Sequence, residues 1–314
     1  MYDPTLPPQK VLKNFRHGSM AQQIREASVS ARRWWWEYLR LSKDYWLLCM
    51  TCPEGKPETY DEALAKTFID FGNVHEGTFE DWWLRTGSAL FAETELPPRV
   101  QELTREGNTI TTAWTEGKIV VEIPLQLTLA TVQAQIDKIL EDQADRPNRQ
   151  LKVSTSRYPI NVTLLRLNVL KQTHEVHCLH RELIEKPKAL AKLGLDNESS
   201  EGQTRADLFR IGKLMRLSMS NATLGADLEL NRAKQRDMRS AVSRFLGKAT
   251  DMIGNVEHGV FPGYEGVSVP KPRFSSKQEC AHADLEAQWW SLDLFSGLSR
   301  VKAEDARRIH YAGD

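Results

Sequence analysis

The sequence predicts a mainly α-helical protein, made of helical bundle domains with one small β-hairpin at about 109–125. Three observations support this fold class. Apolar residues recur at three- and four-residue spacing over long stretches, which is the period of a helix. Capping patterns such as Ser19 with Gln22 precede several of these stretches. Residues 109–125 instead alternate apolar and polar side chains around a turn at 115–118, which is typical of a hairpin.

The same spacing assigns the helices in chain order. The first runs from Met20 to near Pro53, the second is opened by Thr59 and Glu62, and the third is capped by Thr78. Thr128 caps a fourth, whose expected buried face comprises Val132, Ile136, Ile139 and Leu140. Four more are expected at about 160–185, 205–217, 236–258 and 276–297, the last opened by a capping box of Ser276 and Glu279. Residues 258–275 contain several Gly and Pro and are expected to form a loop.

Length and composition indicate two domains. The chain has 314 residues, and a domain commonly has about 100–200. The polar segment 143–159, with Pro147 and Pro159, is the best boundary. We therefore expect an acidic, Trp-rich helical domain with the hairpin at 1–145, and a basic helical domain at 146–314.

The composition also indicates a cytoplasmic protein without a membrane partner. No apolar run approaches the ~18–20 residues that a membrane span needs. The N-terminal region shows no secretory signal pattern. Four cysteines in so long a chain are too few for a disulfide scaffold and fit a reducing compartment.

Charge is distributed unevenly, although 42 basic and 42 acidic residues cancel over the whole chain. Residues 51–145 contain 7 basic and 18 acidic side chains, whereas residues 146–192 contain 10 and 3, and residues 203–250 contain 10 and 4. A basic block of this kind indicates a polyanionic partner. The alternative is that the two halves neutralise one another within one fold.

An apolar stripe and a basic face coincide between residues 236 and 258. Apolar residues from Met238 to Val256 follow helical spacing, and Arg, Ser and Lys occupy the other face. The stretch 238–246 (Met-Arg-Ser-Ala-Val-Ser-Arg-Phe-Leu) resembles the recognition helix of helix-turn-helix domains. The stretch 211–218 (Ile-Gly-Lys-Leu-Met-Arg-Leu-Ser) resembles the helix that precedes one, so the resemblance covers 208–258.

The segment departs from that family in the connection between its two helices. A helix-turn-helix has a turn of three or four residues, whereas about twenty residues separate Ser218 from Met238. Residues 227–236 are then an inserted helix, an N-terminal extension of the next helix, or a mobile loop. A basic amphipathic helix in a four-helix bundle has the same residue pattern, and this alternative stays open.

The resemblance implies a set of DNA-contacting side chains. Arg binds the guanine edge through two hydrogen bonds, Ser binds groove edges or phosphates, and Lys neutralises phosphates. On the two helices the expected contacts are Arg236, Arg239, Ser240, Ser243, Arg244, Lys248, Lys213 and Arg216. Arg149, Lys152 and Arg157 in the polar linker are expected to add phosphate contacts.

Three consecutive tryptophans, Trp34 to Trp36, form the most unusual aromatic feature. Neighbours on a helix lie about 100° apart, so we expect at least one ring to be partly exposed. Trp34 and Trp36 are then candidate contacts for a protein partner, because interfaces favour such rings. The alternative is that they pack beneath a neighbouring helix.

Cysteine and histidine residues raise the question of a metal site. Cys49 with Cys52 and His174 with His177 could formally bind zinc, but their spacing fits no zinc pattern. Helical geometry is expected to place His174 and Cys178 on the solvent side of their helix. We therefore expect no metal and no other cofactor.

No motif indicates an enzyme. The sequence contains no phosphate-binding glycine loop, no nucleophile elbow and no His-Glu-x-x-His zinc motif. Scattered acids such as Asp70 and Glu76 leave a metal-dependent nuclease as the remaining enzymatic alternative.

The sequence thus predicts a DNA-binding accessory or regulatory protein that contacts duplex DNA through its basic C-terminal half. Residues 38–45 and 255–262 resemble stretches of uncharacterised proteins from bacterial mobile elements, and the resemblance implies no activity. A protein partner or a homodimer fits the acidic N-terminal half. The alternative is a non-enzymatic adaptor or inhibitor of a nucleic-acid-processing complex that acts through this acidic half.

Overall fold

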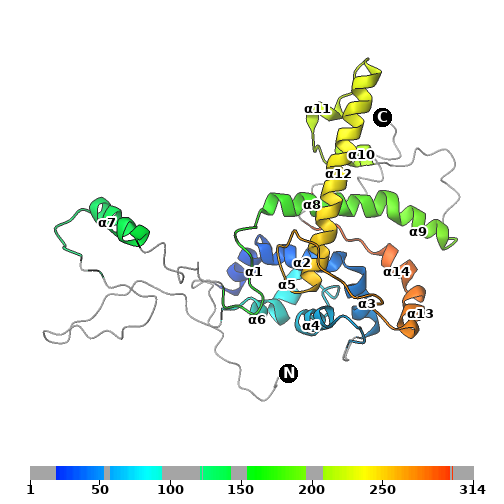
Figure 1. Ribbon diagram of the computed structural model, residues 1–314. Coiled ribbons are helices and arrows are strands. Elements are labelled where there is room, and N and C mark those ends of the chain that lie inside the picture. The colour runs from blue at the N-terminus through cyan, green and yellow to red at the C-terminus, as the bar shows by residue number, and fades with distance from the viewer. Residues whose placement is uncertain are drawn as a thin grey trace.

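The computed structural model describes residues 19–52, 57–93, 121, 123–142, 154–195, 208–297 and 299. Within these ranges the chain is mainly α-helical, as predicted, and forms no strand (Figure 1). One isolated parallel bridge joins Ile160 to Phe261. The predicted β-hairpin at 109–125 lies almost entirely outside the described residues and stays a prediction.

The long first helix of the prediction is three helices: α1 (Met20–Ser28), α2 (Ala31–Leu41) and α3 (Lys43–Thr51). Ser19 caps α1 as expected. Two further serines separate the three helices: Ser30 lies between α1 and α2, and Ser42 lies between α2 and α3. The Ser30 hydroxyl accepts a hydrogen bond from the Arg32 N–H, and the Ser42 hydroxyl accepts one from the Tyr45 N–H. Each supplies the N-cap of a new helix, so the chain changes direction at both.

The next helices are short. They are α4 (Glu62–Phe71), α5 (Phe79–Trp82), a π-helical turn η1 (Trp83–Gly87) and α6 (Ser88–Leu90). Thr78 caps α5 in a capping box with Asp81, as predicted. The N-cap of α4 is Asp61 rather than Thr59. The Thr59 hydroxyl is instead bonded to the Arg273 carbonyl.

The helix α7 (Leu129–Asp142) begins after Thr128, as predicted, but its apolar face is not buried against the other described residues. Val132 and Ile136 are only half-buried, and Ile139 is exposed. The expectation of a buried face on this helix is therefore wrong for Ile139, whereas Val132 and Ile136 are partly buried.

The C-terminal half begins with α8 (Leu167–His180), which continues through a π-helical turn η2 (Arg181–Glu185) into α9 (Lys186–Lys192). Then come α10 (Leu208–Leu214), α11 (Met219–Ala222), the long α12 (Leu228–Glu257), α13 (Ser276–Asp284) and α14 (Glu286–Ser291). The capping box of α13 comprises Ser275 and Gln278, one residue before the predicted pair. None of the described helices, α12 included, combines the length and apolar character of a membrane span.

The main core is aromatic and is centred on α2, which packs against α1, α3, α8 and α12. The Trp35 ring lies 5.6 Å from Phe71, 5.4 Å from Phe91, 5.6 Å from Tyr158 and 5.5 Å from Phe261, measured between ring centroids. Residues on both sides of the expected boundary at 145/146 therefore share this core.

The expectation that one of the three tryptophans is exposed is wrong. Trp34, Trp35 and Trp36 are 4%, 0% and 3% exposed. The three rings do point in different directions, but α2 is surrounded, so each direction meets another element. Trp34 meets His174 of α8, and Trp36 meets Phe79 of α5. Neither Trp34 nor Trp36 is available as a docking ring in this structure.

A second, smaller apolar cluster joins α8, α10 and α12. It comprises Val176, Leu179, Leu183, Ile211, Met215 and Val242. This cluster packs α10 against α12 and is separate from the main core.

Candidate nucleic-acid interface

The helix α12 has two parts with different surroundings. Its C-terminal part is embedded in the body, where Ala249, Met252 and Val256 are fully buried. Its N-terminal part extends beyond α8 and away from the body, with α10 and α11 beside it (Figure 1). Asp227 caps its first turn by accepting hydrogen bonds from the N–H groups of Glu229 and Leu230. Residues 228–236 thus form an N-terminal extension of the predicted helix, one of the three alternatives that the sequence leaves open.

A glycine allows α10 to pack closely on α12. A Cβ atom at Gly212 would overlap the Met238 side chain at Cγ and would lie 3.3 Å from Val242 Cγ2. Met238 and Val242 are themselves fully buried. The face of α12 that contains Met238 and Val242 is therefore the one that packs against α10.

The opposite face of α12 carries the predicted DNA-contacting residues. Arg236, Arg239, Ser240, Ser243, Arg244 and Lys248 are all exposed. At about 100° of rotation per residue, Arg236, Ser240 and Ser243 lie opposite the Met238–Val242 contact, and Arg239 and Arg244 flank them on either side. We call these six residues the basic face of α12.

The surroundings of the basic face are cationic. Residues 228–248 contain six basic and two acidic side chains. Arg232 is ion-paired with Glu229 at 2.7 Å, and the Lys248 ammonium lies 5.9 Å from the Phe245 ring centroid. Within the part of the chain that the structure describes, no carboxylate is ion-paired with Arg236 or Arg244. Among the described residues, the charges of Arg236 and Arg244 are therefore not balanced by an ion pair.

Two further predicted cations, the exposed Arg216 and the half-buried Lys213, lie at the end of α10, which packs on the inward face of α12 rather than on its basic face. Arg216 has φ of 51°, a left-handed conformation. Its N–H donates to the Lys213 carbonyl and the Leu217 N–H donates to the Gly212 carbonyl, which together form a Schellman motif. Glycine is the usual residue at this position, because a side chain raises the energy of left-handed backbone.

The linker cations are not brought to this face. Arg149 and Lys152 lie outside the described residues. Arg157 is ion-paired with Asp70 of α4, and its neighbour Tyr158 packs against Gly259, just beyond the C-terminus of α12. Arg244 precedes that end by 13 residues, which is about 20 Å along a helix. Arg157 therefore contributes to the opposite end of α12.

The histidine–cysteine cluster is buried, contrary to the expectation from helical geometry. His174 and Cys178 are 0% and 2% exposed, because α2 covers this face of α8. Burial, with Arg40 nearby, lowers the pKa of His174 to about 3, and burial raises the pKa of the Cys178 thiol. The imidazole and the thiol, 3.6 Å apart, are thus both held neutral. They form no thiolate–imidazolium pair of the kind that catalysis needs.

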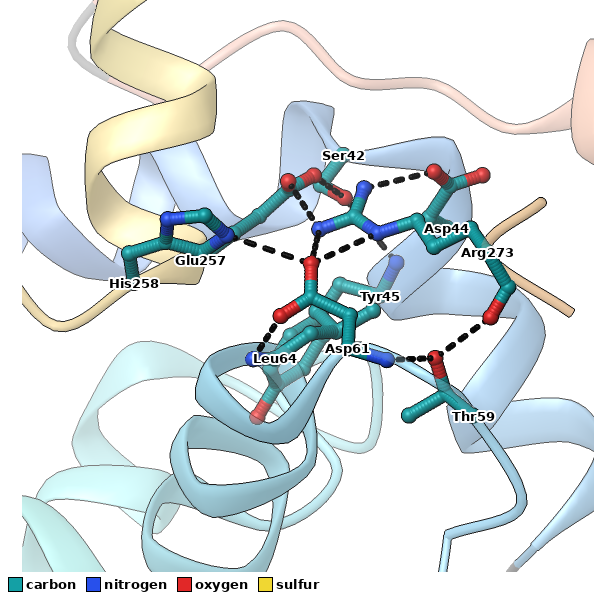
Figure 2. A network of polar contacts seen from close by, with 9 residues as sticks. All are labelled: Ser42, Asp44, Tyr45, Thr59, Asp61, Leu64, Glu257, His258 and Arg273. Atoms are coloured by element: carbon teal, nitrogen blue, oxygen red, sulfur yellow. Dashed lines mark hydrogen bonds and ion pairs between the residues drawn. The ribbon is translucent and has the colours of Figure 1, made fainter. Parts of the chain in front are cut away.

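A polar network that sequence reasoning missed fixes the buried end of α12 (Figure 2). Arg273, in the loop before α13, is bonded by three carboxylates: Asp44 at 2.6 Å, Asp61 at 2.8 Å and Glu257 at 2.8 Å. His258 Nε2 lies 3.1 Å from Asp61, and the Ser42 hydroxyl donates to Glu257. These residues come from α3 and α12, from the N-caps of α3 and α4, and from the loop between α12 and α13.

The charges of the network are stabilised by one another. Burial raises the pKa of Glu257 against the opposing effect of Arg273. Burial also acts to raise the pKa of Asp61, but hydrogen bonds from Leu64, His258 and Arg273 outweigh it and lower that pKa. The network therefore connects the N-terminal helices to the base of α12. No local sequence motif indicates it, because its partners are up to 229 positions apart.

The side chains of the basic face are cations and hydrogen-bond donors, which suit the binding of an anionic partner. Among the described residues no cluster of three or more His, Cys, Asp or Glu could hold a metal ion. Guanidinium, ammonium and hydroxyl groups on an exposed helix are donors for phosphates and base edges. Comparisons with protein-family models, with curated proteins and with solved structures find no match for this chain.

Proposed function

We propose that this protein binds double-stranded DNA through the basic face of α12 and acts as a DNA-binding accessory or regulatory protein. One observation carries the proposal: six exposed arginine, serine and lysine side chains lie on the outward face of a helix that projects from the body. The inward face of the same helix is packed against α10.

The dimensions of α12 suit the major groove of DNA. A helix with its side chains is about 10–12 Å wide, and the major groove is about 12 Å wide. The centre of the basic face has Arg236 and the short side chains of Ser240 and Ser243, and Arg239 and Arg244 stand on either side. This arrangement favours serine hydroxyls near the base edges and arginines against guanines and phosphates.

The order of α10, α11 and α12 supports a relation to helix-turn-helix domains without reproducing their turn. The loop 223–227 is held against α12, since the Asn231 side chain bonds both the N–H and the carbonyl of Gly225. Lys234 also donates to the Thr223 carbonyl at 2.8 Å. The proposed recognition helix is therefore longer than usual and begins at its own capped N-terminus.

The experiment is a fluorescence-anisotropy titration of short labelled duplexes with wild-type protein, Arg244→Ala and Arg236→Ala. The Arg244→Ala experiment needs a duplex that the wild-type protein prefers over other sequences. Loss of a base contact then appears as a weaker preference for that duplex. We expect Arg244→Ala to weaken binding to the preferred duplex by about 1–3 kcal/mol. Loss of a phosphate contact at Arg236 should weaken binding to all duplexes alike.

Arg85→Ala is the matched control, since Arg85 is also partly exposed but lies on η1 in the N-terminal half. Its affinity should equal that of the wild type. Duplex binding that is weakened equally by Arg85→Ala and by the two α12 variants would show only non-specific charge attraction and contradict the proposal.

A further inference from the structure

The two residues that flank the segment 94–153 are bonded to each other. Glu93 directly precedes this segment and Ser154 directly follows it. One carboxylate oxygen of Glu93 accepts a hydrogen bond from the Ser154 hydroxyl. The other oxygen accepts one from the Thr155 N–H at 2.6 Å and one from the Thr155 hydroxyl at 2.7 Å. We call Glu93, Ser154 and Thr155 the Glu93 junction. The chain leaves the helices and returns to them at this junction.

The residues just outside the junction pack on the same two aromatic rings. Phe91 and Tyr158 are each 4% exposed. The Phe91 ring lies 5.4 Å from Trp35 and 6.1 Å from Phe71, measured between ring centroids. The Tyr158 ring lies 5.6 Å and 4.8 Å from the same two rings. The main core therefore holds the chain on both sides of the junction.

The described part of the segment adds nothing to this core. No described residue of 94–153 belongs to the main core. None of the described side chains of α7 is buried, and α7 has no extensive contact with any other described helix. In Figure 1 it lies apart from the other helices. Chain added between two points that lie close together costs little loop-closure entropy, and folds tolerate insertions at such places.

We propose that residues 94–153 are an insertion into a helical body formed by 19–93 and 154–297, and that the Glu93 junction holds the two ends of the insertion together. The body then folds without support from the insertion. It is one unit built from both halves of the chain, in place of two domains that meet at 145/146. This inference stands apart from the proposed function, because its tests require no DNA.

The first test compares proline substitutions within two helices of the full chain. Gln135 lies in α7 and Lys66 lies in α4, and both side chains are exposed. Proline disrupts the interior of a helix at either position. Urea unfolding is followed by tryptophan fluorescence, which reports on the body because eight of the nine tryptophans lie in it. Gln135→Pro should leave the urea midpoint unchanged, whereas Lys66→Pro should lower it. A midpoint lowered by Gln135→Pro would overturn the proposal.

The second test removes the junction from the full chain. Glu93→Ala should lower the urea midpoint, because the substitution removes all three hydrogen bonds that join the two ends. Glu76→Ala is the control. Glu76 is exposed, and its ion pair with the exposed Arg85 contributes little to stability. A Glu93→Ala protein that unfolds at the wild-type midpoint would show that the junction does not hold the ends.

The third test lengthens the insertion. A flexible Gly-Ser segment of about 20 residues, placed after the exposed Gln126 before α7, should leave the urea midpoint unchanged, because it lengthens a loop that is already long. The same segment placed after Ser268 lengthens the much shorter loop that joins Glu257 to Arg273, and it should lower the midpoint. A decrease after Gln126 as large as the one after Ser268 would contradict an independent body.

Discussion

Two glycines in helices have opposite surroundings. At Gly212 an added Cβ would overlap the Met238 side chain, whereas at Gly247 nothing lies within 4 Å of an added Cβ. The first glycine is required by helix packing. The second is not, and a glycine within a helix costs about 0.8–1 kcal/mol relative to alanine.

We therefore predict opposite effects for the same substitution. Gly212→Ala should lower the free energy of unfolding by about 1–3 kcal/mol through overpacking. Gly247→Ala should raise it by about 0.5–1 kcal/mol. Urea denaturation followed by circular dichroism measures both. Equal effects at the two positions would show that α10 does not pack on α12 as described.

Substitution of Arg216 should change the stability of the fold and the affinity for DNA in opposite directions. Because its backbone is left-handed, Arg216→Gly should raise the free energy of unfolding by about 1 kcal/mol. If the side chain contacts a phosphate, the same variant should weaken duplex binding and reduce the salt slope by about 1. A more stable protein that binds less well cannot be explained by unfolding. Unchanged affinity would remove Arg216 from the interface while leaving the role of α12 intact.

At the scale of single elements, capping residues were only partly predictable. Ser19, Thr78 and Thr128 follow polar segments and were recognisable as helix starts. Ser30 and Ser42 were not, because the helical spacing of apolar residues continues through them. The spacing continues since α2 and α3 bury their faces in the same core.

Asp61 combines a cap with an ion pair, and two substitutions distinguish these roles. Asparagine caps helices as well as aspartate does, so Asp61→Asn should lose only the charge interactions with Arg273 and His258. Asp61→Ala should lose the cap as well and be less stable than Asp61→Asn by about 0.5–2 kcal/mol. Thermal unfolding at pH 7 provides the comparison.

The lowered pKa of Asp61 sets the sign of its pH dependence. Its contribution to stability is complete above the ordinary pKa of an aspartate, about 3.9. It is lost as the pH falls through the lower pKa of the folded protein. Wild-type protein should therefore lose more stability than Asp61→Asn below about pH 4. Parallel stability curves for the two proteins in this range would contradict the ion pair.

The basic face was the part of the candidate site most open to prediction. The apolar stripe from Met238 to Val256 requires that Arg236, Arg239 and Arg244 point outward, and they do. The position of Arg157 was not predictable, because it depends on Asp70, 87 residues away in the chain. The burial of His174 depends likewise on α2, which covers a face of α8 that the pattern assigns to solvent.

In the molecule as a whole, helices from both halves of the chain pack into one core, and the sequence alone does not predict this packing. Trp35 lies among Phe71, Tyr158 and Phe261, which come from both sides of the expected domain boundary. The Arg273 network spans the same halves. Contacts between residues so far apart in the sequence produce no repeating pattern of residue types. The helices can therefore be predicted from the sequence, but the way they pack together cannot.

The burial of His174 makes global stability depend on pH. Its pKa of about 3 in the folded protein lies below the ordinary 6.5, so below pH 6.5 the unfolded chain binds one more proton. Stability should fall by about 2 kcal/mol between pH 7 and pH 5 from this residue. His174→Gln, which does not titrate, should show a smaller fall in urea denaturation. An equal fall in both proteins would mean that His174 is not buried.

If the exposed cations on α12 bind duplex DNA, the affinity must depend on the salt concentration. Duplex affinity should be measured from low to moderate salt for wild-type protein and for a variant with Arg236, Arg239 and Arg244 all replaced by alanine. For the wild type, log K should fall linearly with log salt, with a slope of about −0.9 per phosphate contact. The triple variant should bind weakly, and its slope should be shallower by about 3. Wild-type protein that fails to bind duplex even at 50 mM salt, or a triple variant with an unchanged slope, would contradict the account.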